Sequence, residues 1–354
     1  MKLNYKQTIL IGLAFLSISA FWQMYDNIIP LILKNSFDLG ETVTGVIMAA
    51  DNVLALFLLP FFGSLSDKTN TKIGKRMPFI LTGTGLSVIF LLLLPTADRT
   101  RNLPFFITVL FLVLLAMGLY RSPSVALMPD LTPKPLRSKG NAVINLMGAV
   151  GGVYSLIMIR LLVGSGATPD YFPLFLAIAL LMILSVIILF FTIKENRNQP
   201  DKNAVKKKNG SKDMQISAES DLTDSGKTAA AGSALAPDVR RSLVFMLLSI
   251  ALWFIAYNAV TTAFSRYATH VWGMENGGYA NCLMVATVAA IISYIPIGAI
   301  SSHIGRKKTI LIGVVLLALC YLCAAFYNSY HVTMNIFFGI IGFAWAAINV
   351  NSFP

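Results

Sequence analysis

Long apolar segments, separated by short polar stretches, make up most of this chain. A helix needs about 20 mostly apolar residues to cross the hydrocarbon of a bilayer. Inside a bilayer such a segment must be helical, because only then does it satisfy its own backbone hydrogen bonds. The ten predicted spans are residues 8–33, 42–64, 77–96, 104–128, 141–163, 172–193, 243–266, 279–301, 309–327 and 333–354. The pattern therefore predicts an all-α protein that crosses the lipid bilayer many times.

Charge adds an orientation to these spans. The chain is 56% hydrophobic and 12% charged, and its formal net charge is +12. If the N-terminus is cytoplasmic, 22 of the 28 Lys and Arg residues fall in cytoplasmic segments, which is the positive-inside bias of membrane proteins. This distribution explains the basic charge without a nucleic-acid partner. We expect a multi-pass plasma-membrane protein, in the inner membrane of a bacterium, with a cytoplasmic N-terminus.

One connection is much longer than the others and divides the chain. Residues 194–242 are basic at first and then rich in Ser, Ala and Thr, so we expect a disordered cytoplasmic linker. It separates an N-terminal half of six spans, residues 1–193, from a C-terminal half of four spans, residues 243–354. A complete second half would need two more helices. We expect the second half to be truncated, unless the protein has ten spans.

The two halves share a weak repeat in the loop after their second span. Residues 63–76 and 298–308 both combine glycines, which permit tight turns, with a basic cluster on the predicted cytoplasmic face. In the first loop, Asp67 lies near two basic residues and is predicted to form a latch that favours one state of a two-state cycle. The predicted gating residues are Gly63, Asp67, Gly74, Lys75, Arg76 and Arg306.

The first loop also carries a family resemblance. The segment Pro60-Phe-Phe-Gly-Ser-Leu-Ser-Asp67, followed by Gly74-Lys-Arg-Met-Pro-Phe-Ile-Leu81, resembles the signature loop of the major facilitator superfamily. Its Gly-Lys-Arg-x-Pro-Phe ending and the segment Arg121-Ser-Pro-Ser-Val-Ala-Leu-Met-Pro-Asp-Leu131 resemble more narrowly the glycoside–pentoside–hexuronide:cation symporters and the sucrose-transporter-like branch. The resemblance implies a major-facilitator-type helical bundle with two pseudo-repeated halves around a midplane site.

Two ion-coupling sites of these relatives have no counterpart here. The melibiose-carrier branch has two carboxylates in helix 2, where this chain has Ala55 and Leu59. Plant-type sucrose carriers have an Asp in helix 4, where this chain has residues 114–116, Leu-Leu-Ala. A coupling group must therefore be sought among the other charged residues of the spans.

Four charged residues lie inside predicted spans, short of the last residue of any span: Asp26, Asp51, Arg121 and Arg160. Both carboxylates fall roughly 10–14 Å below the outer boundary, counted at 1.5 Å of helix rise per residue. We predict that Asp26 or Asp51 carries a coupling proton; the alternative is that each bonds a neighbouring helix. Arg121 is predicted to bind substrate or to pair with a carboxylate, or else to anchor at the cytoplasmic face. Arg160 is expected to extend to the interface.

Aromatic and amide side chains gather in the first and fourth helices of each half, which line the central cavity in major facilitators. Indole rings stack on the C–H faces of sugars, and amides bond hydroxyl groups, so we predict a sugar site; the alternative is an aromatic belt at the interface. The predicted substrate-binding residues are Trp22, Gln23, Asn27, Tyr120, Arg121, Trp253, Tyr257, Asn258, Trp345 and Asn349.

These patterns favour a secondary transporter over an enzyme. No nucleophile–base set or phosphate-binding loop appears, and the pair Cys320 and Cys323 has no further ligand nearby, so we read both as packing residues and expect no metal and no cofactor. The predicted function is proton-coupled symport of a sugar or glycoside by a monomer, with H⁺ as the coupling ion. The alternatives are proton-coupled efflux of a small amphiphile and a non-transporting fragment or sensor.

Overall fold

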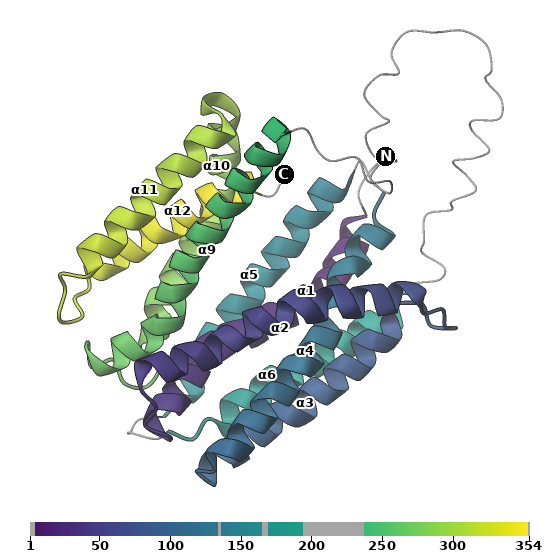
Figure 1. The fold of residues 1–354 in the computed structure, drawn as a ribbon, viewed down its shortest axis with the longest axis horizontal. Helices are drawn as coiled ribbons and strands as arrows, with labels where there is room; N and C mark the ends of the chain where they lie inside the picture. Colours follow the sequence, from purple (N-terminus) through teal and green to yellow (C-terminus); the bar gives the residue numbers. More distant parts are fainter. Residues whose placement is uncertain (1–3, 134–135, 165–168, 194–236, 353–354) are drawn as a thin grey trace. The chain divides into compact units, whose positions relative to one another are not determined.

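The computed structural model describes residues 4–133, 136–164, 169–193 and 237–352, and within them every regular element is an α-helix (Figure 1). The described helices are α1 (Tyr5–Asn35), α2 (Glu41–Lys68), α3 (Met77–Arg99), α4 (Leu103–Leu131), α5 (Arg137–Leu162), α6 (Phe172–Thr192), α9 (Pro237–His270), α10 (Tyr279–Ile304), α11 (Arg306–Ala324) and α12 (Met334–Ser352). They correspond to the predicted spans and confirm the all-α membrane fold. Most of the predicted linker lies outside the described residues.

Eight of the described helices are long and apolar enough to cross a membrane, namely α1 to α6, α11 and α12. α10 contributes a shorter apolar segment, Tyr279–Tyr294. α2 continues four residues beyond the predicted end of its span and so includes the acidic residue Asp67. Side chains such as Leu56 and Phe57 are exposed on α2, as expected for a helix that presents an apolar face to lipid.

The described chain forms two compact units. Among the described residues, the first contains residues 4–133, 136–164, 169–193 and 261–352, and the second contains residues 237–260. α9 therefore begins in the second unit and ends in the first. This division differs from the predicted halves, residues 1–193 and 243–354. Those halves were defined by the grouping of the spans on either side of the linker, and they stay a prediction.

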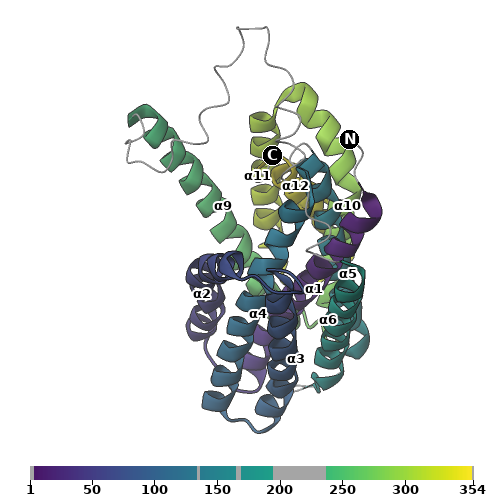
Figure 2. The same ribbon diagram turned by 90° about the vertical axis from the view of Figure 1, so that its right-hand side faces the viewer.

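Within the first unit, α1 packs along α5, where Gly151 of α5 faces the backbone of Leu16. α1 is the most buried of the eight long apolar helices. α3 packs along α4 (Figure 2). α12 packs against both α10 and α11. Local signals set the helix ends, since the side chains of Asn4 and Asn102 accept hydrogen bonds from the first turns of α1 and α4. α4 also packs against α2, and α1 contacts both of them; these three helices carry Asp26, Asp51 and Arg121.

Contacts between loops identify the two ends of this unit. Arg101 donates to the carbonyl of Ser36 at 3.5 Å, and Arg99 pairs with Asp170 at 2.7 Å. Because these residues flank the connections after α1, α3 and α5, successive helices run in opposite directions, as in a chain that crosses a membrane repeatedly. We call this the expected outer end and the end with residues 69–76 the expected cytoplasmic end; the orientation itself stays a prediction.

Candidate functional site

Three charged side chains meet between α1, α2 and α4. Asp26, Asp51 and Arg121 are each half-buried, and all three interact electrostatically with one another. The guanidinium carbon of Arg121 lies 5.5 Å from the centre of the Trp22 ring, within the range of a cation–π contact. The structure therefore brings together two acidic residues, one basic residue and one indole that the sequence had placed on three separate helices.

A small recess opens beside this cluster. It is lined by Trp22, Asp51, Leu54, Ala55, Leu58, Leu59, Leu114, Gly118 and Arg121. Its volume of ≈ 20 Å³ has room for about one water molecule, so the walls would have to separate before a sugar could enter. The wall is apolar except for the indole and the two charged groups. Such a wall keeps the dielectric low around the charges and strengthens their mutual attraction.

Three buried polar atoms of α1 have no hydrogen-bond partner within the described residues, and one of them belongs to Trp22, which lines the recess. They are Nε1 of Trp22, the hydroxyl of Tyr25 and Oδ1 of Asn27. The Nδ2 of Asn27 donates to the carbonyl of Gln23 at 2.8 Å, so only the amide oxygen is left without a partner there. Buried polar atoms left in this way are costly unless water or a ligand satisfies them.

Tyr120 was predicted to bind substrate, but here it joins two helices. Its side chain is fully buried, its hydroxyl lies 2.7 Å from Oγ of Ser17, and it donates to the carbonyl of Ala14 at 3.2 Å. Because both partners belong to α1, the tyrosine fastens α4 to α1 below the charged cluster. This position holds Arg121, the next residue along α4, against the recess.

The C-terminal residues of the predicted cavity are less closely tied to this cluster. Trp253, Tyr257 and Asn258 lie on the part of α9 that belongs to the second unit, so their place in a shared cavity stays a prediction. Trp345 and Asn349 are both half-buried and lie one turn apart on α12, and Trp345 packs against a small apolar cluster that includes Ala290 and Ala346.

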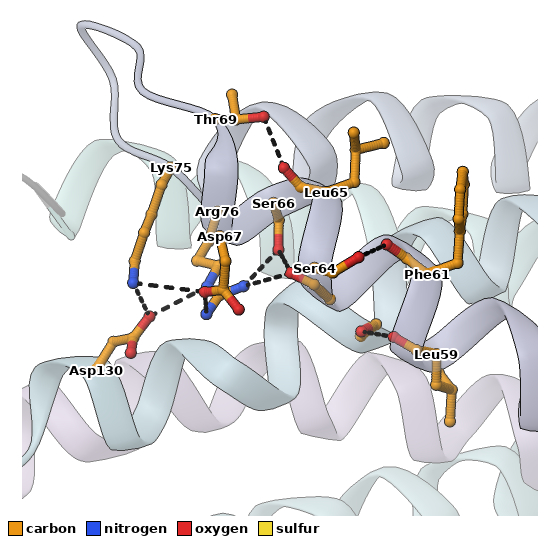
Figure 3. A network of polar contacts seen from close by, with 12 residues as sticks. Leu59, Phe61, Ser64, Leu65, Ser66, Asp67, Thr69, Lys75, Arg76 and Asp130 are labelled. Atoms are coloured by element: carbon orange, nitrogen blue, oxygen red, sulfur yellow. Dashed lines mark hydrogen bonds and ion pairs between the residues drawn. The ribbon is translucent and has the colours of Figure 1, made fainter. Parts of the chain in front are cut away.

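A second charged cluster lies at the expected cytoplasmic end and centres on Arg76 (Figure 3). The Arg76 side chain is only 5% exposed. It pairs with Asp67 and Asp130, and it donates to Oγ of Ser66 and to the carbonyl of Gly63 at 3.3 Å. The arginine thereby ties the start of α3 to the ends of α2 and α4, and the paired carboxylates offset the cost of burying its charge.

Asp130 is the member of this cluster that the sequence analysis did not select. Lys75 lies 2.9 Å from Asp130 but 3.8 Å from Asp67, so the pair with Asp130 is the closer one. The signal was present in the family-like segment, where the acidic residue ends α4 after a run of apolar residues. Of the other predicted gating residues, Gly74 adopts a φ of 118° in the turn, and Arg306 is exposed at the start of α11, outside this cluster.

The two acidic partners of Arg76 should differ in importance. We expect Asp130→Asn to slow transport more than Asp67→Asn, because Asp130 is 25% exposed and Asp67 is 57% exposed, and water screens the more exposed charge. Either change should leave substrate affinity nearly unchanged, since both residues act on the balance between states. Transport rates and binding constants of the two purified variants test this; a large loss of affinity with normal turnover would contradict it.

Within the described residues, no group of three or more His, Cys, Asp or Glu side chains is arranged to hold a metal ion. Cys320 is buried in α11 and Cys323 is exposed on the same helix. Their reading as packing residues stays a prediction.

Known proteins resemble this chain in sequence and in fold. The profile of the Major Facilitator Superfamily matches residues 11–354. The sucrose transport protein SUC3 of Arabidopsis thaliana is 30% identical over 140 residues, which are 34% of this chain and 23% of that protein. This match therefore spans about a quarter of the relative's length.

Solved structures share the fold at low sequence identity. The xylose transporter XylE from E. coli, in a partially occluded inward open conformation, matches with a TM-score of 0.65 at 13% identity, over 99% of this chain and 86% of that one. A bacterial homolog of the human lysosomal transporter Spinster matches with a TM-score of 0.66 at 16% identity, over 99% and 75%. The nucleoside transporter NupG matches with a TM-score of 0.64 at 12% identity, over 98% and 81%.

Proposed function

Because this chain belongs to the major facilitator superfamily, we propose that it moves a sugar or glycoside across a membrane together with a proton. The chain is a multi-pass membrane transporter and not an enzyme. The observation that carries the finer proposal is the cluster of Asp26, Asp51 and Arg121 beside the Trp22 ring.

Charge balance supports proton coupling at this cluster. With both carboxylates ionised, Asp26, Asp51 and Arg121 together carry one net negative charge; after one proton binds, they carry none. An uncompensated charge is costly in a dry interior, whereas a balanced set is much less so. The protonated cluster can therefore be enclosed while the carrier changes state, and the ionised cluster favours a state in which water reaches it. A step that depends on protonation in this way links transport to a proton gradient.

The groups around the cluster suit a polyhydroxylated substrate. The indole of Trp22 offers an apolar face and, at Nε1, a hydrogen-bond donor without a partner within the described residues. Sugars present C–H faces and hydroxyl groups in the same small area, so they satisfy both kinds of contact. SUC3 is named for sucrose and XylE for xylose, which supports the same substrate class. The solute and the membrane, a bacterial plasma membrane, are part of this proposal.

Accumulation of radiolabelled sugar in proteoliposomes tests this function. We expect uptake of a sugar such as sucrose or xylose to rise when the outside is made acidic and to collapse when a protonophore dissipates the gradient. Counterflow of the same sugar should persist without a gradient, because exchange needs no net proton movement. Proton-dependent extrusion of an amphiphile, with no sugar counterflow, would favour the efflux alternative instead.

Thiol labelling tests the proposed topology. In a variant without the native cysteines, we expect Asn70→Cys to react only from the cytoplasmic side and Thr100→Cys only from the outside. Both positions are exposed and lie at opposite ends of the first unit, and an impermeant reagent cannot cross the bilayer. Reaction of both cysteines from one side would contradict the topology.

The native protein should elute as a monomer in detergent.

A further inference from the structure

We propose that Glu41, Arg266 and Gly277 form a gate that closes the expected outer end by joining the helices before the linker to those after it. This inference rests on the proposed transport function. It concerns access to the recess, and its test reads accessibility rather than transport.

The first contact of the gate is an ion pair between α2 and α9. The Nη2 of Arg266 lies 2.7 Å from Oε2 of Glu41. The arginine side chain is 8% exposed, whereas the glutamate side chain is 72% exposed. A buried guanidinium without a counter-charge is strongly unfavourable. The closed arrangement therefore depends on Glu41 remaining beside Arg266 at the expected outer end.

The ion pair is also incomplete. The Nε and Nη1 groups of Arg266 are buried and have no hydrogen-bond partner within the described residues. Each unmade hydrogen bond raises the free energy of the closed arrangement. The Glu41–Arg266 contact is charge-balanced but lacks hydrogen bonds, so it stabilises the closed arrangement only in part. A gate requires such partial stabilisation, because it must open in every transport cycle.

The second contact joins the loop before α10 to the end of α5. Gly277 has a φ of +65°, and a Cβ at this position would lie 2.8 Å from the carbonyl oxygen of Ile159. The next residue of α5, Arg160, donates to the carbonyl of Asn276 at 3.3 Å. A glycine is needed here for its conformation and for the close approach. Arg160, expected only to extend to the interface, takes part in this contact.

The ion pairs described at the opposite end have a different arrangement. Those of Lys75 and Arg76 reach Asp67 and Asp130, which all lie in α2 to α4 or the loop between them. They fasten neighbouring helices of the N-terminal group to one another. The Glu41–Arg266 pair instead connects that group to α9, so its breaking frees one group to move relative to the other.

The experiment measures labelling of a cysteine in the recess. Ala55→Cys, in a variant without the native cysteines, reports access from the side on which Thr100→Cys reacts. We expect Glu41→Gln and Gly277→Ala each to raise the labelling rate from that side, roughly tenfold for a shift of about 1.4 kcal/mol in the balance between the closed and open states. The exchange Glu41→Arg with Arg266→Glu should restore slow labelling.

Each variant has a matched control. Asp170→Asn removes a partner from the Arg99 pair, which has the same 2.7 Å length and lies at the same end within the N-terminal helices. Gly273→Ala is the control for Gly277→Ala. Gly273 has the same φ of +65° as Gly277, but a Cβ on Gly273 would meet nothing within 4 Å. The controls should leave labelling unchanged, because they do not disturb a contact between the groups.

Equal labelling of the gate variants and their controls would overturn the gate. So would faster labelling from both sides, since that indicates loosening of the whole fold rather than opening of one end. If Glu41→Gln fails to fold, the labelling rates of Gly277→Ala and Gly273→Ala still decide whether the gate exists. A protein that shows the expected labelling but moves no sugar would retain the gate and lose the proposed function.

Discussion

Asp26→Asn should abolish accumulation of substrate against its gradient while sparing downhill exchange. The amide keeps the shape of the side chain but cannot take up or release a proton, so the cluster with Asp51 and Arg121 would be charge-balanced without a bound proton whenever Asp51 is ionised. Asp26 is our first choice because it lies one helical turn from Trp22, which places proton and substrate on one face of α1. Proton-driven uptake and counterflow by the purified variants in proteoliposomes check this expectation.

Two further variants decide the assignment. Asp51→Asn tests the second carboxylate of the cluster, and either Asp can prove to be the coupling group. Asp38→Asn is the matched control: this residue is also close to a basic side chain, Lys34 at 2.8 Å, but it is 90% exposed at the expected outer end. The hydrogen bond and charge of Lys34 lower the pKa of Asp38, so it stays ionised at neutral pH and should not affect coupling. Normal accumulation by both the Asp26 and Asp51 variants would place the coupling group elsewhere.

Gly151→Ala should prevent α1 and α5 from packing. A Cβ on Gly151 would lie 1.9 Å from the carbonyl oxygen of Leu16 and 2.7 Å from its carbonyl carbon. These are backbone atoms of a long helix, so no side chain can rotate away and the two helices must separate. Overpacking commonly costs about 1–3 kcal/mol and occasionally more. We expect the upper end of this range or beyond, because α1 is the most buried of the eight long apolar helices.

Gly85→Ala provides the control for this prediction. Gly85 also lies inside a helix, α3, but it is exposed and a Cβ there would meet nothing within 4 Å. The control should retain or slightly raise stability, since alanine favours helix over glycine. The yield of monodisperse protein and its thermal unfolding in detergent measure both variants. Equal stability of the two would show that the approach of α1 to α5 is looser than described.

The spans follow from the sequence because a lipid environment allows few backbone structures. Apolar segments of about 20 residues must be helical in a bilayer, and this constraint acts on each segment by itself. The all-α fold was therefore predicted without knowledge of any tertiary contact. Exact ends were less well predicted: α2 continues past its apolar stretch to Lys68, since polar residues extend a helix into the interface without cost to its hydrogen bonds.

The charged residues of the candidate site were also visible in the sequence, because any charge inside a span is unusual. Asp26 and Asp51 were placed at similar depths by counting residues along two helices. Counting cannot give the rotation of each helix about its axis. Only the packing of α1, α2 and α4 shows that Arg121 faces both carboxylates and lies over Trp22, and that Tyr120 beside it turns to α1 instead.

The tertiary structure alone decided which distant residues become partners. Asp130 lies 54 positions from Arg76 in the chain, and Glu41 and Arg266 come from opposite sides of the linker. A residue's own neighbours determine whether it prefers a helix, whereas its partner depends on how whole helices pack. The sequence by itself therefore determined the helices, the family resemblance and the list of charged residues inside them, and the packing of helices decided how those charges combine.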